Sequence, residues 1–401
     1  MKIVCPPGAP VLPNLRCWQE LEVSQCVCAP AALHLPAAGR SSANPALAGF
    51  RFYITCKKKM KLKQIGEFEF IKKISSDCLV RPDHVVKAIG DDAAAFYQDS
   101  DTLTLVTTDM LVERIHFLKE SVSGFNLGYK SLAVNLSDIA AMGGTAGEAF
   151  VCLAIPEDCS MDYLEDFYLG IKTLAKKFKV NILGGDTTGS KNDLIINISV
   201  VGSVPKDEIM KRDGAKPGDV IYSAGFLGDS RAGLNLILNN IAVNSTELKR
   251  LRKAHLLPEP QLEEGRFLAQ MKRVHSAIDI SDGLSSDLYH ILCQSRRGAK
   301  IYAEKIPVSK HLEFFCSRFG FNSIEFALSG GEDYKLLFTV SPAYSDEVAE
   351  KFQKKFNRKI YPIGRITESE RVDLILPDGG TRPLSSSGWD HFKDNDINEP
   401  Q

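Results

Sequence analysis

A carboxylate stands in the middle of an apolar helical pattern, and it limits how this chain can fold. The segment 126–144 (NLGYKSLAVNLSDIAAMGG) has helical periodicity and a Gly-Gly stop. Asp138 shares a turn with Leu136 and Ile139, so its carboxylate can be neither cheaply buried nor easily solvated. A bound cation resolves this conflict, because oxygen ligands suit Mg²⁺.

The same conflict recurs along the chain. Five further aspartates lie at the edge of, or inside, segments otherwise suited to a core: Asp92, Asp109, Asp186, Asp279 and Asp282. The stretch TTD (107–109) adds two hydroxyls, those of Thr107 and Thr108, to a carboxylate. The stretch GGD (184–186) offers a backbone that can approach a phosphate closely. Together these residues predict a site for several metal ions and a phosphate.

Each acid also has an ordinary interpretation. Asp92 follows a Gly-Asp pair, which is common turn chemistry. Asp186 before two threonines could form a simple turn, and Asp282 could cap a helix. Asp279 could be a buried, hydrogen-bonded acid. These alternatives stay open for single residues, and only the recurrence favours the metal site.

Composition argues against several classes of partner. The 401 residues include 49 basic and 50 acidic side chains, so no net charge attracts nucleic acid or an anionic membrane. No apolar run approaches the length of a membrane span. The cysteines after residue 59 show no C-x-x-C spacing, which indicates a reduced, cytoplasmic protein.

Residues 1–59 differ from the rest of the chain. They contain no aspartate, are rich in proline and alanine, and show no sustained period. We interpret them as a disordered leader or as the product of a start codon assigned too early. A targeting leader and a folded element are the alternatives.

From Met60 onward the pattern is typical of alternating strands and helices. It predicts strands at 102–110, 148–155, 333–340 and 359–364, and helices at 162–178, 246–256, 260–272 and 345–356. The stretch AKPGDV (215–220) marks a boundary. We therefore expect a mixed α/β protein with an N-terminal domain at 60–205 and a C-terminal domain at 215–394.

Familiar nucleotide and zinc signatures are missing. The stretch GGDTTGSK (184–191) lacks the Gly-Lys-Ser/Thr order of a P-loop, because Ser190 precedes Lys191. The chain has no H-R-D or G-x-G-x-x-G motif, and its eight histidines show no ligand spacing.

The acid-bearing segments nevertheless resemble the thiamine-monophosphate kinase family, within the wider aminoimidazole ribonucleotide synthetase-like superfamily. The matching motifs occur in order over about residues 65–392: GEFEFIKKI, IGDDAA, TTDMLVERIHF, KSLAVNLSDIAAMGG, GGDTT, DGAKPGD, DISDGLSSDL, LSGGEDYKLLF and GWDHF. Residues 1–59 have no counterpart in the resemblance.

The resemblance implies a two-domain synthetase-like fold whose N-terminal sheet forms a homodimer interface, with ATP bound at that pairing. The implied metal ligands are Asp92, Thr107, Thr108, Asp109, Asp138, Asp186, Asp279 and Asp282. The implied ATP contacts are Tyr168, Gly185, Asp186, Arg212 and Ser281, and the implied substrate contacts are His116, Glu332 and Trp389. Gly189 stands where the family often has arginine, which leaves Arg212 as the expected phosphate-binding arginine.

The implied reaction is phosphorylation of thiamine monophosphate by ATP, the final step of thiamine diphosphate biosynthesis. The acceptor is a phosphate whose second pKa is about 6, so no general base is required. We expect direct in-line transfer assisted by several Mg²⁺ ions. The alternatives are an ATP-dependent synthetase of the same superfamily, a metal-dependent phosphohydrolase and a non-catalytic nucleotide-binding module.

Overall fold

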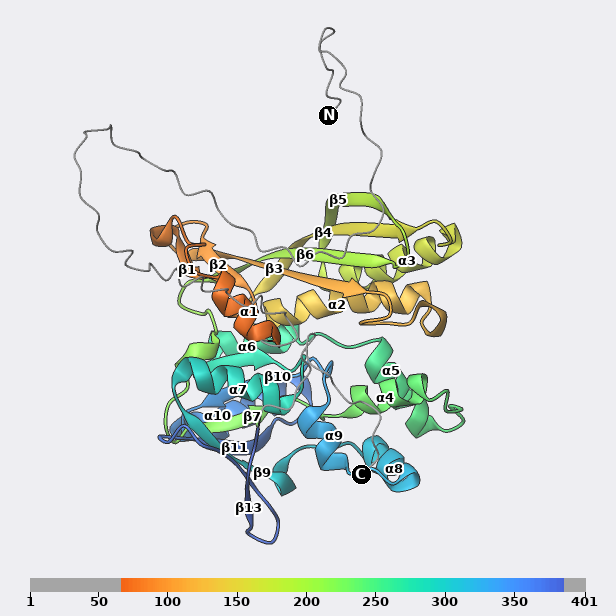
Figure 1. Ribbon diagram of the computed structural model, residues 1–401. Helices are drawn as coiled ribbons and strands as arrows, with labels where there is room; N and C mark the ends of the chain where they lie inside the picture. The colour runs from red at the N-terminus through yellow and green to blue at the C-terminus, as the bar shows by residue number, and fades with distance from the viewer. Residues whose placement is uncertain (1–65, 386–401) are drawn as a thin grey trace, which may run out of the picture. The chain divides into compact units, whose positions relative to one another are not determined.

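The computed structural model describes residues 66–385, so the predicted leader and Trp389 lie outside the described residues. Two sheets, each flanked by helices, make up the described chain (Figure 1). The first sheet is built from strands before residue 206 and the second from strands after residue 219. The mixed α/β fold predicted from the sequence is therefore confirmed, while the domain boundaries at 205 and 215 stay a prediction.

The first sheet has the order β1-β2-β3-β6-β4-β5 and is antiparallel except for the parallel pair β4–β5. Its strands are β1 (Val85–Lys87), β2 (Ala94–Tyr97), β3 (Thr102–Val112), β4 (Thr145–Pro156), β5 (Asn181–Ser190) and β6 (Ile195–Pro205). Along β3, Leu103, Leu105 and Thr107 are buried, whereas Thr108 and Met110 are exposed on the opposite face. This alternation follows from the two-residue period of a strand.

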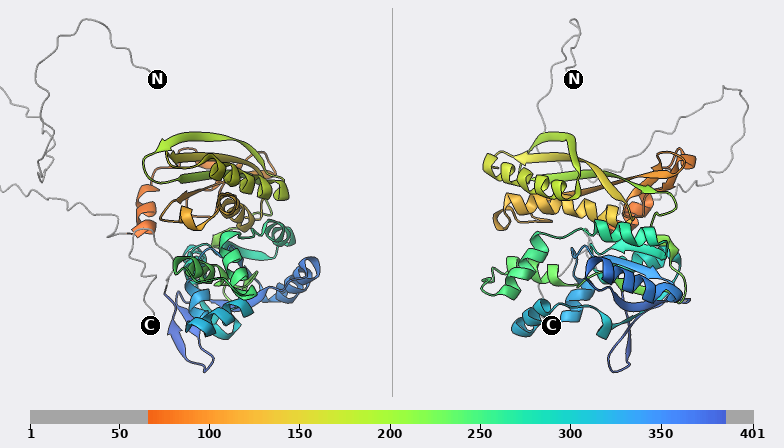
Figure 2. Two further views of the ribbon diagram at one scale, coloured as in Figure 1. Left: turned by 90° about the vertical axis from the view of Figure 1, so that its right-hand side faces the viewer. Right: turned by 180° about the vertical axis from the view of Figure 1, so that it is seen from behind.

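One face of this sheet is covered by the helices α2 (Gly124–Ala141) and α3 (Met161–Phe178), while the short helix α1 (Gly66–Ile74) precedes the sheet in the chain (Figure 2). The two long helices approach closely because glycine stands at their contact. A Cβ on Gly128 would lie 1.8 Å from the carbonyl oxygen of Phe167, and a Cβ on Gly170 would lie 2.0 Å from that of Phe125. Larger residues at these points would force the helices apart and displace Asp138.

The second sheet has the order β13-β12-β9-β11-β7-β10-β8. Its strands are β7 (Val220–Ser223), β8 (Val274–Asp279), β9 (Gly298–Tyr302), β10 (Leu336–Val340), β11 (Tyr361–Thr367), β12 (Val372–Ile375) and β13 (Thr381–Pro383). Its helices are α4 (Asp229–Leu238), α5 (Thr246–Leu256), α6 (Leu262–Met271), α7 (Leu284–Ser295), α8 (Lys310–Phe319), α9 (Ser323–Ser329) and α10 (Ser345–Phe356).

Helix α2 connects the two halves. It contacts β3 and β6 of the first sheet and also β8 and α6, which belong to the second half. Most of its side chains are buried, including the polar residues Lys130, Asn135 and Ser137. Because α2 is buried on most sides, polar side chains in both its first and its second half lie in the interior of the protein. No helix within residues 66–385 is long and apolar enough to cross a membrane.

Candidate active site

Three of the predicted metal ligands meet in one place. Asp92 lies in the loop between β1 and β2, Asp138 lies on α2, and Asp279 is the last residue of β8. Each offers a carboxylate oxygen, and these oxygens lie within 4.8 Å of one another. Segments up to 187 residues apart in the sequence thus deliver like charges to a single point, and mutual repulsion opposes that arrangement.

The interior position of these acids changes how readily they ionise. Burial, together with the neighbouring Asp279, raises the pKa of Asp92 to about 7, although the Arg212 guanidinium acts against this rise. Burial raises the pKa of Asp279 to about 6. The pKa of Asp138 is raised well above its ordinary value, first by burial and then by Asp109 and Asp279. Such shifts mark a cluster that a divalent cation would stabilise.

Two hydroxyl groups donate hydrogen bonds to carboxylates of the cluster, one from β3 and one from α2. Thr107 donates its hydroxyl hydrogen to Asp138 Oδ2, and Ser137 donates to Asp279 Oδ2 at 2.6 Å. Asp109 faces the same side of β3 as Thr107, and burial and Asp92 raise its pKa to about 6. Four predicted ligands and Thr107 therefore share this interior site.

Thr108 is placed differently. Its side chain lies on the other face of β3, is exposed, and accepts hydrogen bonds from Asn197 and Ser199 at 3.0 Å each. The structure therefore does not bring the Thr108 hydroxyl to Asp138, because adjacent residues of a strand point in opposite directions.

Asp282 belongs to a second, neighbouring group. One possible ligand atom from each of Asp282, Asp287 and His290 lies within 4.8 Å of the other two, and the last two residues belong to α7. Asp287 also accepts hydrogen bonds from the backbone N–H groups of Asp282 (3.1 Å) and Gly283 (3.0 Å). The N-cap of α7 is Gly283, so Asp282 is not the helix cap that the sequence left open.

Arg212, expected from the sequence to bind phosphate, pairs with the carboxylates. Its guanidinium forms an ion pair with Asp92, and its Nε lies 3.8 Å from Asp91 Oδ1. Burial would lower the pKa of Arg212, but Asp92 and Asp91 outweigh it and raise that pKa above its ordinary value. The arginine expected to bind ATP phosphates is thus held at the edge of the carboxylate cluster.

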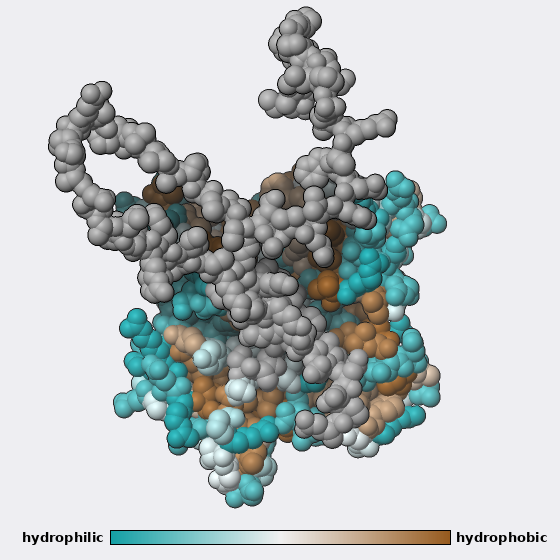
Figure 3. Space-filling view, in the orientation of Figure 1, coloured by the Kyte–Doolittle hydropathy of each residue, from teal (hydrophilic) through white to brown (hydrophobic). Residues whose placement is uncertain are grey.

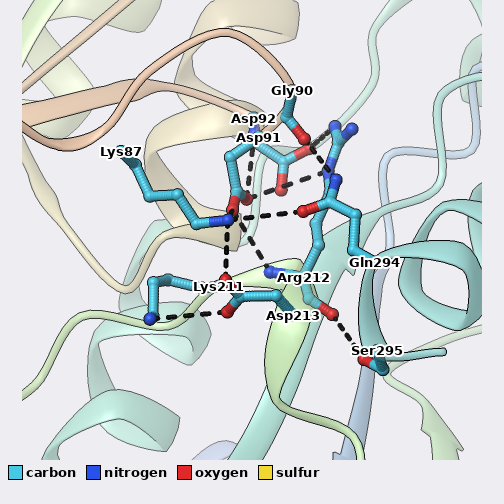
Figure 4. Close-up of polar contacts among 9 residues, drawn as sticks. All are labelled: Lys87, Gly90, Asp91, Asp92, Lys211, Arg212, Asp213, Gln294 and Ser295. Carbon is cyan, nitrogen blue, oxygen red and sulfur yellow. Dashed lines mark hydrogen bonds and ion pairs between the residues drawn. The ribbon is translucent and has the colours of Figure 1, made fainter.

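A second layer of contacts holds the loop that carries Arg212 (Figure 4). Lys87 Nζ lies 3.0 Å from both Asp91 and Asp213, and 3.3 Å from Gln294 Oε1. Gln294 in turn donates to the carbonyl of Gly90. These contacts join β1, the loop before β2, the loop before β7 and the end of α7, so they fix where Asp92 and Arg212 meet.

The residues present fit Mg²⁺. The donors in the interior cluster are carboxylate and hydroxyl oxygens, which hard divalent cations prefer. Asp92 Oδ2 is buried and has no hydrogen-bond partner within the described residues, so a charged acceptor is left aimed into the cluster. An orphaned buried carboxylate oxygen is costly unless a cation satisfies it.

The remaining predicted ATP contacts lie in different settings. Asp186 and Gly185 are exposed on β5, which forms the edge of the first sheet. Gly185 has φ 148°, and a Cβ there would lie 1.7 Å from the carbonyl oxygen of Val151. Tyr168 is half-buried on α3, and Ser281 lies two residues after the end of β8, next to Asp282. The interior cluster and Asp186 therefore lie on opposite faces of the first sheet.

Two of the three predicted substrate contacts are described. The ring Nδ1 of His116 accepts a hydrogen bond from the backbone N–H of Val112 at 3.0 Å. Glu332 lies in the loop between α9 and β10, where its backbone N–H donates to the carbonyl of Ser281 at 2.6 Å. Glu332 therefore adjoins the loop that carries Asp279 and Asp282.

Known proteins share this arrangement of domains. Residues 90–204 match the N-terminal domain of AIR synthase related proteins, and residues 216–377 match the C-terminal domain. A thiamine-monophosphate kinase from Haemophilus influenzae is 38% identical over 82% of this chain and 99% of its own. The kinase of the same name from Aquifex aeolicus is 35% identical over 83% of this chain and 100% of its own. The chain belongs to the thiamine-monophosphate kinase family.

A solved structure supports the same assignment. The structure described as "AaThiL complexed with AMPPCP and TMP" has a TM-score of 0.73 at 35% identity, and the match covers 83% of this chain and 99% of that one. The family predicted from the sequence motifs is thereby confirmed. The roles of single residues in this thiamine-monophosphate kinase family member stay predictions.

Several residues that contact or surround the carboxylate cluster were not predicted from the sequence as site residues. Asp91, Lys87 and Gln294 support the cluster, but their contacts join segments that are distant in sequence. Asp287 and His290 are spaced like an ordinary polar helix face, so no local signal marks them. Lys130 did carry a signal, because it is a charged residue inside the same apolar helix as Asp138.

Proposed function

We propose that this protein transfers the terminal phosphate of ATP to thiamine monophosphate, giving ADP and thiamine diphosphate. The observation that carries the proposal is the buried cluster of Asp92, Asp138 and Asp279, found in a chain of the thiamine-monophosphate kinase family. The relative described as complexed with AMPPCP and TMP supports both substrates. The reaction would be the final step of thiamine diphosphate biosynthesis.

Several Mg²⁺ ions are part of the proposal. Asp92, Asp109, Asp138 and Asp279 would hold them, with Thr107 orienting Asp138 and Asp282 adding a ligand from the neighbouring group. When bound, Mg²⁺ neutralises the phosphates of two polyanions and stabilises charge in the transition state.

The side chains do the rest through binding and orientation. Arg212, fixed by Asp91 and the Lys87 contacts, supplies a planar cation that can bind phosphate oxygens bidentately. The acceptor phosphate is largely ionised near neutral pH, so the site needs no residue to remove a proton. Transfer is then direct and in line, without a phosphoenzyme, and inversion at a chiral, isotopically labelled γ-phosphate would test that step.

We also propose a homodimer that pairs through the first sheet. The outer face of this sheet carries exposed apolar side chains, among them Met110 (55% exposed), Phe150 (38%) and Leu183 (61%). Figure 3 shows apolar surface in the upper half of the view, where Figure 1 draws these strands. Asp186 and Gly185 lie on the exposed edge strand beside this face, which suits an ATP site completed by a second copy.

One assay tests the activity. Purified protein is incubated with ATP, Mg²⁺ and thiamine monophosphate, and the thiamine phosphates are separated as fluorescent thiochromes. We expect thiamine diphosphate and ADP in equal amounts, and neither when Mg²⁺ is chelated. Phosphate release without thiamine monophosphate would favour a phosphohydrolase, and nucleotide binding with no product would leave only a binding module. The cytoplasmic location and the lack of nucleic-acid and membrane partners stay predictions.

A further inference from the structure

A buried lysine meets the predicted substrate residue Glu332. Lys130 lies on α2 with 4% of its surface exposed, and its Nζ is 2.8 Å from Glu332 Oε2. His255, near the end of α5, is 6% exposed and places its ring Nδ1 3.1 Å from the same oxygen. Burying an ammonium group is unfavourable unless a charged partner compensates it, so this contact is built into the fold.

The network joins four segments. His255 Nδ1 also lies 3.1 Å from Ser230 Oγ on α4, and its Nε2 lies 3.5 Å from Lys130 Nζ. A neutral ring protonated at Nδ1 donates to Glu332 and accepts from the Lys130 ammonium at Nε2. Burial and the Lys130 charge lower the pKa of His255, which favours that neutral ring. Helices α2, α4 and α5 thus fix one side chain of the loop after α9.

The backbone around Glu332 is held just as firmly. Glu332 has φ 61° and Tyr334 has φ 49°, which are left-handed conformations that non-glycine residues rarely adopt. Glu332 N–H donates to Ser281 at 2.6 Å and Tyr334 N–H donates to Ile280 at 2.8 Å. Unfavourable backbone conformations of this kind persist where the surrounding contacts enforce them, often at ligand sites.

The network leaves one oxygen of the carboxylate available. Both Lys130 and His255 contact Oε2, and within residues 66–385 no polar contact of Oε1 is found. Burial would raise the pKa of Glu332, but Lys130 and His255 outweigh it and keep that pKa below its ordinary value. The side chain is 26% exposed, so an ionised, oriented acceptor reaches the surface of the site.

The position matches the shape of the proposed substrate. Lys130 and Asp138 lie eight residues apart on α2, which corresponds to about 12 Å along the helix axis. A molecule with a phosphate at one end and a cationic, amine-bearing ring system at the other can span that distance. Its phosphate would meet the carboxylate cluster and its metal ions, and its rings would meet Glu332.

We propose that Lys130 and His255 are positioning residues that orient Glu332, so that Oε1 recognises the cationic, amine-bearing rings of thiamine monophosphate. This inference rests on the proposed function. It adds two residues that determine substrate affinity without touching the reacting phosphates.

The test compares substrate constants in single variants. Lys130→Met and His255→Phe should raise the KM for thiamine monophosphate about 10- to 100-fold, the loss expected when a charge-assisted contact is disordered. The KM for ATP should change less than about threefold. His255→Asn keeps an N–H donor near the Nδ1 position and should recover part of the affinity. Lys351→Met, which breaks the exposed pair with Glu347, is the matched control and should leave both constants unchanged.

A double variant separates positioning from general stability. If Lys130 acts through Glu332, then adding Lys130→Met to Glu332→Gln should raise the substrate KM no further than Glu332→Gln alone. Additive effects, or equal changes in the KM values of both substrates, would show a structural role and overturn the inference. If the wild-type protein forms no thiamine diphosphate, the proposed function itself fails. Wild-type activity with an unchanged KM in Lys130→Met would refute only the inference.

Discussion

Replacing Asp138 with asparagine should stabilise the metal-free protein while it abolishes turnover. In the structure, carboxylate oxygens of Asp92, Asp138 and Asp279 lie within 4.8 Å of one another. Two unit charges at that separation repel by about 3.5 kcal/mol at an effective dielectric constant of about 20. Asparagine keeps the shape, removes the charge, and still offers an oxygen to the Thr107 hydroxyl.

Protonation limits the size of this gain. Asp138 can escape repulsion in the folded state by keeping a proton, since its pKa is raised well above the ordinary 3.8. Keeping that proton costs more free energy as the pH rises, because a carboxyl group in the unfolded chain is ionised above about pH 4. Because the unfolded chain loses the proton first, wild-type stability falls as pH rises above about 4. We therefore expect Asp138→Asn to be about 1–3 kcal/mol more stable near pH 7, with a smaller difference near pH 5.

Metal binding should narrow or reverse the difference in stability between the two proteins. Mg²⁺ that binds only the folded state adds about 2.7 kcal/mol at a concentration 100 times its Kd. The wild-type protein should gain this stability, whereas Asp138→Asn should gain far less, and its kcat should fall at least about 100-fold.

The measurement is urea unfolding at two pH values, in EDTA and in Mg²⁺. Asp207→Asn, which changes an exposed carboxylate paired with Lys272, serves as the control and should behave like the wild type. The reasoning fails if Asp138→Asn is less stable than the wild type in EDTA near pH 7. It also fails if Mg²⁺ stabilises both proteins equally.

Three further outcomes are expected. Arg212→Met leaves the buried carboxylate of Asp92 without its partner, so this variant should unfold at a lower urea concentration in EDTA and recover stability in Mg²⁺. Its KM for ATP, measured by kinetics with both substrates, should be raised about 10- to 100-fold. Burial raises the pKa of Asp333 to about 7, so the stability of the wild type should fall as the pH rises from about 4 to 7. Urea unfolding across that range should show that Asp333→Asn lacks this contribution to the pH dependence of stability. Leu183→Asp should convert the proposed dimer into monomers in sedimentation experiments and lower activity with it, whereas a dimer that persists would place the interface elsewhere.

The fold was predictable where local pattern and packing agree. The acids near the start and lysines near the end of α3 placed that helix within one residue, and α10 was placed at its observed bounds. The short strands β1, β2, β7, β9, β12 and β13 were missed, because three to five residues carry too little periodicity to stand out. The helices α8 and α9 were also not predicted.

The convergence of several aspartates was predictable from the sequence, but the full set of residues that meet there was not. An aspartate inside an apolar segment signals a compensating charge, and Asp92, Asp138 and Asp279 do meet. The stretch TTD (107–109) led to the prediction that both threonine hydroxyls join one site, although the two-residue period of a strand already implies that Thr107 and Thr108 face opposite sides. The pairing of Asp92 with Arg212 joins residues 120 positions apart, and no local pattern encodes such a contact.

Helix α2 buries two charged residues of opposite sign, Lys130 and Asp138. The conflict that drew attention to Asp138 applies equally to Lys130, eight residues earlier in the same apolar helix. Asp138 lies among other carboxylates, whose charges the proposed metal ions would compensate, while Lys130 forms an ion pair with Glu332. In the proposed function, Asp138 would hold metal ions and Lys130 would orient Glu332, and both residues stand on one rigid helix. A substrate with a phosphate at one end and a positive ring at the other matches this arrangement of charges. Reversing the charge at Asp138 should weaken binding of the phosphate end, and reversing the charge at Lys130 should weaken binding of the ring end.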